Sequence, residues 1–263
     1  MKSVTGVFRS RSDAQDALAE LRSLGLREDR ITLLTPGTME KDLQSVPVVA
    51  AEQPGMAKAM GALVGAAAGL SGGPLVVAAL IPGVGPITAI GLLGGAVLAA
   101  AGASVGAVAG GKLENAMTEG LPEDELFVYE DALRQGRSVV IALAQDEAEA
   151  SRFREVLKTE AAELVDAARE QWWIGLRGAE QEHYSKFGRN LSDDEKFYRQ
   201  GFESALHART RCKEYDQVLA EMNAEVEELE RQHPGAEVAE PFRRGYERGR
   251  DYYQRLCDES RAA

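Results

Sequence analysis

Two of the three histidines in this chain follow a glutamate at the spacing used by metal-binding helices. Glu180-x-x-His183 and Glu230-x-x-His233 each place a carboxylate and an imidazole on one helical face. A di-iron bundle needs two such motifs and two further glutamates, but His233 precedes Pro234, where a helix ends and no bundle interior is expected. We therefore expect surface histidines and no metal.

The other motifs of catalysis and cofactor binding are incomplete. Gly83-x-Gly85 and the run from Gly91 to Gly95 lack both the Lys-Ser/Thr of a phosphate loop and the acidic partner of a dinucleotide site. Two cysteines lie far apart without a CxxC motif, which argues against zinc; we expect free buried thiols, or a pair if their helices face each other. They are Cys212 and Cys257. The sequence predicts no catalytic residue, no cofactor and no enzyme.

Charge limits the partners. The 263 residues include 30 basic and 42 acidic side chains, for a net charge of -12. Such a surface repels phosphate backbones, so nucleic acid is excluded as the main partner.

The most informative stretch is residues 59–111, which contains no charged residue. We expect two apolar helices, 60–81 and 84–111, each long enough to cross the roughly 30 Å hydrocarbon core of a bilayer. Glycines spaced by four would place a small-residue face on each helix and let the two pack closely, as a glycine-zipper hairpin. The glycines assigned to helix association are Gly61, Gly65, Gly69, Gly91, Gly95, Gly102, Gly106 and Gly110. The residues assigned to the turn are Pro82, Gly83, Gly85 and Pro86.

Three environments would hide such a hairpin from water: a membrane, a homo-oligomer, or an ordinary core. Ala and Gly contribute little transfer free energy, so each segment alone is a marginal membrane span. We expect membrane lipid and further copies of the chain as partners. The absence of a signal peptide, and Lys58 and Lys112 at the feet of the hairpin, place the chain at the cytoplasmic membrane with its soluble parts in the cytoplasm. The alternative is a cytoplasmic location.

The regions on both sides of the tract read as an α+β domain. Before the linker 36–58 we expect a strand at 4–8, a helix capped by Ser12 or Asp13 and ended by Gly25, and a strand at 31–34. After the tract we expect a helix at 123–135, a buried strand at 138–144, a helix capped by Asp146, and a short strand at 163–166. Residues 1–35 and 112–168 would then form one split ferredoxin-like βαββαβ sheet, with the hairpin inserted.

The remaining region, 169–263, is predicted to be an acidic helical tail. An aromatic-Arg-x-Gly-aromatic-Glu motif occurs twice in it, at 198–203 and 242–247. Two copies predict a pair of equivalent helices that pack through a glycine. The packing residues are Gly201, Phe202, Gly245 and Tyr246. Trp172 and Trp173 are expected to be a packed core pair, with anchoring at a membrane interface as the alternative.

The opening run from Val4 to Leu26, the strand Ile-Thr-Leu-Leu-Thr-Pro, and Tyr129 to Gly136 before a Val-rich strand resemble the general stress protein 17M-like (heat-induced stress protein) family over about residues 1–168. The layout is also similar to the small two-helix membrane subunit of alternative complex III, although nothing in the sequence supports a haem-complex role. The resemblance implies a stress-associated protein and supplies no catalytic residues. We expect a non-enzymatic membrane protein that self-associates through its hairpin; the alternative is a soluble protein whose bundled hairpins form a closed homo-oligomeric assembly.

Overall fold

A computed structural model describes residues 2–37, 66–67, 76–81, 84–91 and 124–262. These fall into two compact units. The first comprises Met1–Pro122 and Val128–Ala168, and the second Glu123–Phe127 and Arg169–Ala263. The mixed α+β class expected from the sequence is confirmed: the first unit holds an antiparallel sheet with helices, and the described part of the second is helical.

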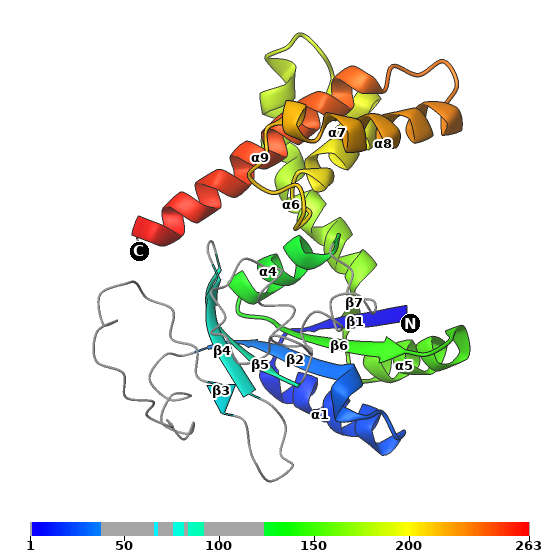
Figure 1. The fold of residues 1–263 in the computed structure, drawn as a ribbon, viewed down its shortest axis with the longest axis vertical. Helices are drawn as coiled ribbons and strands as arrows, with labels where there is room; N and C mark the ends of the chain where they lie inside the picture. The colour runs from blue at the N-terminus through cyan, green and yellow to red at the C-terminus, as the bar shows by residue number, and fades with distance from the viewer. Residues whose placement is uncertain (1, 38–65, 68–75, 82–83, 92–123, 263) are drawn as a thin grey trace. The chain divides into compact units, whose positions relative to one another are not determined.

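The sheet of the first unit has seven described strands in the order β3-β4-β5-β2-β6-β1-β7, and every neighbouring pair is antiparallel (Figure 1). The strands are β1 (Lys2–Phe8), β2 (Ile31–Pro36), β3 (Ala66–Ala67), β4 (Val76–Ile81), β5 (Gly85–Ile90), β6 (Ser138–Ala144) and β7 (Glu163–Leu164). The strands expected at 4–8, 31–34 and 138–144 are confirmed, because β-branched runs bounded by turn residues favour a pleated, buried surface.

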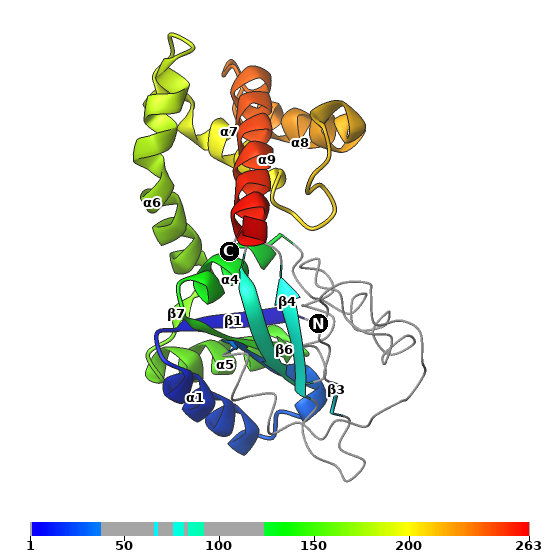
Figure 2. The same ribbon diagram turned by 90° about the vertical axis from the view of Figure 1, so that its left-hand side faces the viewer.

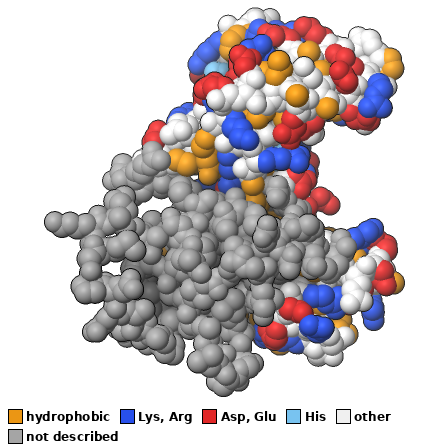
Figure 3. All heavy atoms as spheres, in the orientation of Figure 1, with side chains coloured by type: hydrophobic (Ala, Val, Ile, Leu, Met, Phe, Trp, Pro, Cys, Tyr) orange, Lys and Arg blue, Asp and Glu red, His pale blue; other side chains and the backbone are white. Residues whose placement is uncertain are grey.

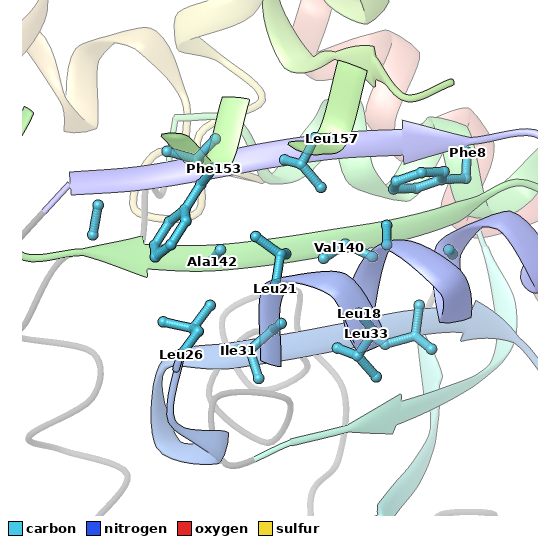
Figure 4. Packing of buried hydrophobic residues seen from close by; sticks show 14 of the residues in the cluster. Phe8, Leu18, Leu21, Leu26, Ile31, Leu33, Val140, Ala142, Phe153 and Leu157 are labelled. Atoms are coloured by element: carbon cyan, nitrogen blue, oxygen red, sulfur yellow. The ribbon is translucent and has the colours of Figure 1, made fainter. Parts of the chain in front are cut away.

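Helices α1 (Arg11–Ser23) and α5 (Glu147–Thr159) pack on one face of this sheet (Figure 4). Buried side chains recur along each helix at three- and four-residue intervals, which makes one apolar stripe. These are Ala14, Ala17, Leu18 and Leu21 on α1, and Ala150, Phe153 and Leu157 on α5. The cap at Asp146 is confirmed, whereas α1 is capped one turn earlier than expected: the Ser10 hydroxyl accepts from the Asp13 N–H at 3.1 Å.

One bidentate ion pair fixes the start of α5 in the first unit. Arg30 ends the short 3-10 helix η1 (Glu28–Arg30), and its Nη1 and Nη2 lie 2.9 and 3.0 Å from the two carboxylate oxygens of Glu149. Arg30 Nη1 also donates to the carbonyl of Leu143. Both side chains are mostly buried, so the pair joins η1, β6 and α5.

The described part of the uncharged tract corrects the expected helical hairpin. Residues 76–81 and 85–90 are the strands β4 and β5, which pair with each other and, through β5, with β2 (Figure 2). The predicted turn does separate two segments, since Val84 N–H donates to Ile81 C=O and Ile81 pairs with Gly85, but Gly85 and Pro86 already belong to β5. Among the described residues, no helix has the length and apolar character needed to cross a membrane.

The second unit consists of helices. They are α6 (Val165–Ser185), which begins in the first unit, α7 (Leu191–Ser204), the 3-10 helix η3 (Tyr215–Gln217), α8 (Leu219–Gln232) and α9 (Ala239–Ala262). Helix α4 (Leu126–Arg134) likewise belongs to both units. A core forms where α7, η3, α8 and α9 meet; it includes Phe197, Tyr215, Met222, Val226, Phe242 and Tyr246.

Candidate functional site

The closest approach within the second unit is the crossing of α7 and α9. Gly201 of α7 faces the backbone carbonyl of Phe242, and Gly245 of α9 faces that of Tyr198; a Cβ on either glycine would overlap these carbonyl atoms. A third glycine, Gly249, lies against the carbonyl of Phe202 in the same way. The two motif glycines thus occupy equivalent places, and the helices touch backbone to backbone.

The two motif copies also repeat their polar contacts. Arg199 pairs with Glu203 on α7, and Arg243 pairs with Glu247 on α9, each four residues apart. Each arginine also lies over an aromatic ring: Arg199 is 5.6 Å from the centroid of Trp173, and Arg243 is 5.1 Å from that of Tyr215. Cation–π packing and i,i+4 pairing therefore hold both copies in similar surroundings.

A buried ion pair ties α6 to α9. Glu180, whose side chain is 1% exposed, receives Arg248 Nε and Nη2, each at 2.9 Å to one of its oxygens. The Tyr198 hydroxyl also donates to Glu180 at 2.7 Å. The arginine neutralises the charge of the buried carboxylate, and the tyrosine supplies a further hydrogen bond to it.

A second triad of the same composition joins α6 to α7. Asp194 receives Arg189 Nε at 2.8 Å and Nη2 at 3.1 Å, and the Tyr184 hydroxyl donates to it at 2.7 Å. The rings of Tyr184 and Tyr198 lie edge to face, with centroids 4.9 Å apart, so the two triads adjoin.

A surface groove of about 360 Å³ lies beside the first triad. Phe187, half-exposed just after α6, is stacked by the Arg244 guanidinium at 4.1 Å from its ring centroid. The other lining residues are His183, Glu240, Arg243, Glu247, Arg248 and Asp251. On the face seen in Figure 3, basic and acidic side chains intermix over the helices of this unit.

Burial changes the pKa of three groups in and beside the groove. Burial and the neighbouring carboxylates raise the pKa of Tyr184 and of Tyr198 well above the ordinary phenol value. Burial, followed by the charge of Arg248, lowers the pKa of His183. The three arginines that line the groove are paired with Glu247, Glu240 and Glu180. These paired side chains hold the helices around the groove together.

The side chains of the two Glu-x-x-His motifs make other contacts. Glu180, the carboxylate of Glu180-x-x-His183, is taken by Arg248 and Tyr198, and in the second motif His233 contacts the Lys196 ammonium and the Phe197 ring. Within the described ranges, no group of three or more His, Cys, Asp or Glu side chains could hold a metal ion. No disulfide joins the cysteines: Cys212 is exposed and Cys257 is buried.

The tryptophan pair packs inside the second unit. Trp172 and Trp173 are 7% and 2% exposed, and the ring of Phe202 lies edge-on to both. Phe127 contacts Trp172 with centroids 4.7 Å apart. The Trp173 indole N–H donates to Glu195 at 2.8 Å. The expectation of a core pair is confirmed in this unit.

Most residues assigned to helix association lie outside the described part of the chain. These are Gly61, Gly65, Gly69, Gly95, Gly102, Gly106 and Gly110, together with the turn residues Pro82 and Gly83. Gly91 is described and follows β5; its φ is +117°, and a Cβ there would overlap the Ile31 carbonyl. Gly91 therefore abuts β2, and its small size serves the sheet, not a helix pair.

The sequence does not predict the triads or the groove. Glu180 and Arg248 are 68 positions apart, and no local pattern marks them as partners. Their neighbourhood carries one usable signal: the motif glycines bring α7 and α9 together, and Arg248 follows Gly245 by one helical turn.

Comparison with known proteins finds no matching family model, no matching curated protein and no matching solved structure.

Proposed function

We propose that this chain is a non-enzymatic, self-associating protein whose uncharged tract is covered by other copies of itself. The observation that carries the proposal is the composition of residues 59–111, which lack any charged side chain in a chain of net charge -12. An apolar surface of that extent is unstable in water unless something covers it. The helical tail then supplies an acidic, rigid exterior to the assembly.

The strands within the tract favour coverage by protein. β4 and β5 belong to the same sheet as β2, β6 and β1, and α1 and α5 cover one face of that sheet. Open sheet edges do not occur in the hydrocarbon of a bilayer, because their N–H and C=O groups would have no partners there. Attachment to a membrane through the rest of the tract is the second candidate, and the same lack of charge supports it.

We also infer that the first unit is a split ferredoxin-like fold with the tract inserted. Its support is the strand order β2-β6-β1-β7, antiparallel throughout, with α1 between β1 and β2 and α5 between β6 and β7. The resemblance to the stress-protein family extends the proposal to a stress-associated role.

The absence of enzymatic activity is part of the proposal. It is supported by the state of the buried carboxylates Glu180 and Asp194, each held by an arginine and a tyrosine. A catalytic carboxylate needs an open approach for substrate, and Glu180 and Asp194 are both buried.

Light scattering on the intact chain, without detergent, tests the proposal. We expect a discrete particle whose mass is a multiple of 28.3 kDa. Sedimentation with anionic phospholipid vesicles separates the two candidates, because a membrane protein pellets with vesicles and resists a salt wash. A monomer that stays in the supernatant in both experiments contradicts self-association and membrane attachment together.

A further inference from the structure

One strand of the sheet is paired unevenly on its two sides. β4 pairs with β5 over its whole length, from Val76 to Ile81. On its other side β3 reaches only Val76 and Val77. Among the described strands, none pairs with the outer side of Ala78–Ile81, so the outward N–H and C=O groups of alternate residues in this segment have no ladder partner in the described part of the chain.

The composition of β4 makes its outer side suitable for pairing with another strand. Its sequence is Val-Val-Ala-Ala-Leu-Ile, with no charge, proline or glycine. Natural sheet edges are usually protected by lysine, proline, a bulge or extreme shortness. An uncharged strand that begins with two valines, ends with isoleucine and lacks proline and glycine is instead of the kind that pairs strands between molecules.

The opposite edge of the same sheet differs in charge. β7 is as short as β3 and pairs only with Gly6 and Val7 of β1, but Glu163 within it forms an ion pair with Arg137, and Lys2 of β1 pairs with Glu147. Each edge is therefore only partly covered by a two-residue strand, but charged side chains protect one edge, whereas β4 at the other carries no charge.

We propose that the outer side of Ala78–Ile81 pairs, antiparallel, with the same segment of a second copy of this chain. The inference rests on the proposed function and supplies an interface for it. A second copy fits because a two-fold axis brings identical segments together in opposite directions, which satisfies an antiparallel ladder. With no charged residue in either strand, no like charges meet across the axis.

Cysteine cross-linking tests the pairing and its register. Single cysteines at Val77, Ala78, Ala79 and Leu80, each in a chain carrying Cys212→Ser and Cys257→Ala, are oxidised in the assembled protein. Side chains directly opposite each other share a sheet face, so a two-fold ladder sets one residue against its own copy. We expect a disulfide-linked dimer at that position and several-fold less at its neighbours, because a disulfide needs Cβ atoms about 4 Å apart. The control, Leu164→Cys on the β7 edge, should give no dimer.

Hydrogen exchange on the unaltered chain is a second test of the β4 interface and needs no substitution. Amide protons on the outer side of Ala78–Ile81 should exchange several-fold more slowly at high than at low protein concentration, while those of β6 should not change. If the chain assembles but shows neither the cross-linked dimer nor the slowed hydrogen exchange, the β4 interface is wrong and the proposed function still stands. A chain that remains monomeric at every concentration overturns the proposed function itself.

Discussion

Gly201 and Gly245 hold equivalent positions in the crossing of α7 and α9, each facing the carbonyl of the aromatic residue that opens the other motif. Backbone meets backbone on both sides, so neither contact can yield as a flexible side chain would. The two copies of the motif are therefore joined by a local two-fold relationship, and each needs the other's glycine.

Gly201→Ala should destabilise the protein by about 1–3 kcal/mol, the usual cost of overpacking, despite the gain of about 1 kcal/mol in helix propensity. The matched control is Gly178→Ala in α6, where a Cβ meets nothing within 4 Å. That variant should be slightly more stable than the parent chain. Urea unfolding followed by tryptophan fluorescence measures both. Equal stability of the two variants would contradict the claim that the crossing of α7 and α9 leaves no room for a side chain at Gly201.

Glu180→Gln should cost about 3–5 kcal/mol, because it leaves Arg248 partly buried without its counter-charge. The control is Glu247→Gln, which breaks an exposed pair with Arg243 on the same helix and should cost under about 1 kcal/mol. Thermal unfolding compares them. Similar small losses for both would mean that water, not Glu180, solvates Arg248.

The Arg30–Glu149 pair predicts a loss of stability in acid. Its hydrogen bonds with Arg30 hold the pKa of Glu149 below the ordinary value. Such a group stabilises the fold above its unfolded pKa of about 4.3, and this contribution disappears as the pH falls through the lower folded value.

Glu149→Gln should therefore be less stable than the parent chain at pH 7, and the gap should narrow below about pH 4. Urea unfolding across this pH range measures it. Glu155→Gln, at an exposed position of α5, serves as the control and should match the parent at pH 7. A gap that stays constant into acid would contradict the role given to the charge.

Gly91→Ala should destabilise the first unit more than Gly25→Ala. Both glycines have positive φ, +117° and +87°, so alanine at either costs about 1 kcal/mol in backbone strain. Only Gly91 also abuts a carbonyl, that of Ile31, whereas the space at Gly25 is open. Hydrogen exchange of β2 and β5 reports the difference. Equal losses of stability in the two variants would show that the chain at Gly91 does not contact the Ile31 carbonyl of β2 closely.

The regions that flank the tract could be read from the sequence because their patterns are local. Ala14, Leu18 and Leu21 recur at helical spacing, and the short run at 138–144 indicates a buried strand through its β-branched residues and the glycine before it. The tract itself could not. Glycines spaced by four suit a helix pair, but Val76, Val77 and Ile81 suit a strand equally, and pairing with β2 through β5 decides between them.

The candidate site was only half accessible to sequence reasoning. A repeated motif pointed to Gly201 and Gly245, since repetition is visible without a structure. The partnership of Glu180 with Arg248 is a property of the folded helices and has no counterpart in spacing along the chain.

The second unit draws Glu123–Phe127 from a part of the chain that precedes β6, and the ring of Phe127 lies against Trp172. Its sequence is therefore interrupted by that of the first unit. During synthesis, Phe127 leaves the ribosome long before its aromatic neighbours exist. The first unit is complete at Ala168, whereas the second must still recruit Phe127 from the earlier part of the chain, and a fragment beginning at Arg169 lacks a piece of its own core.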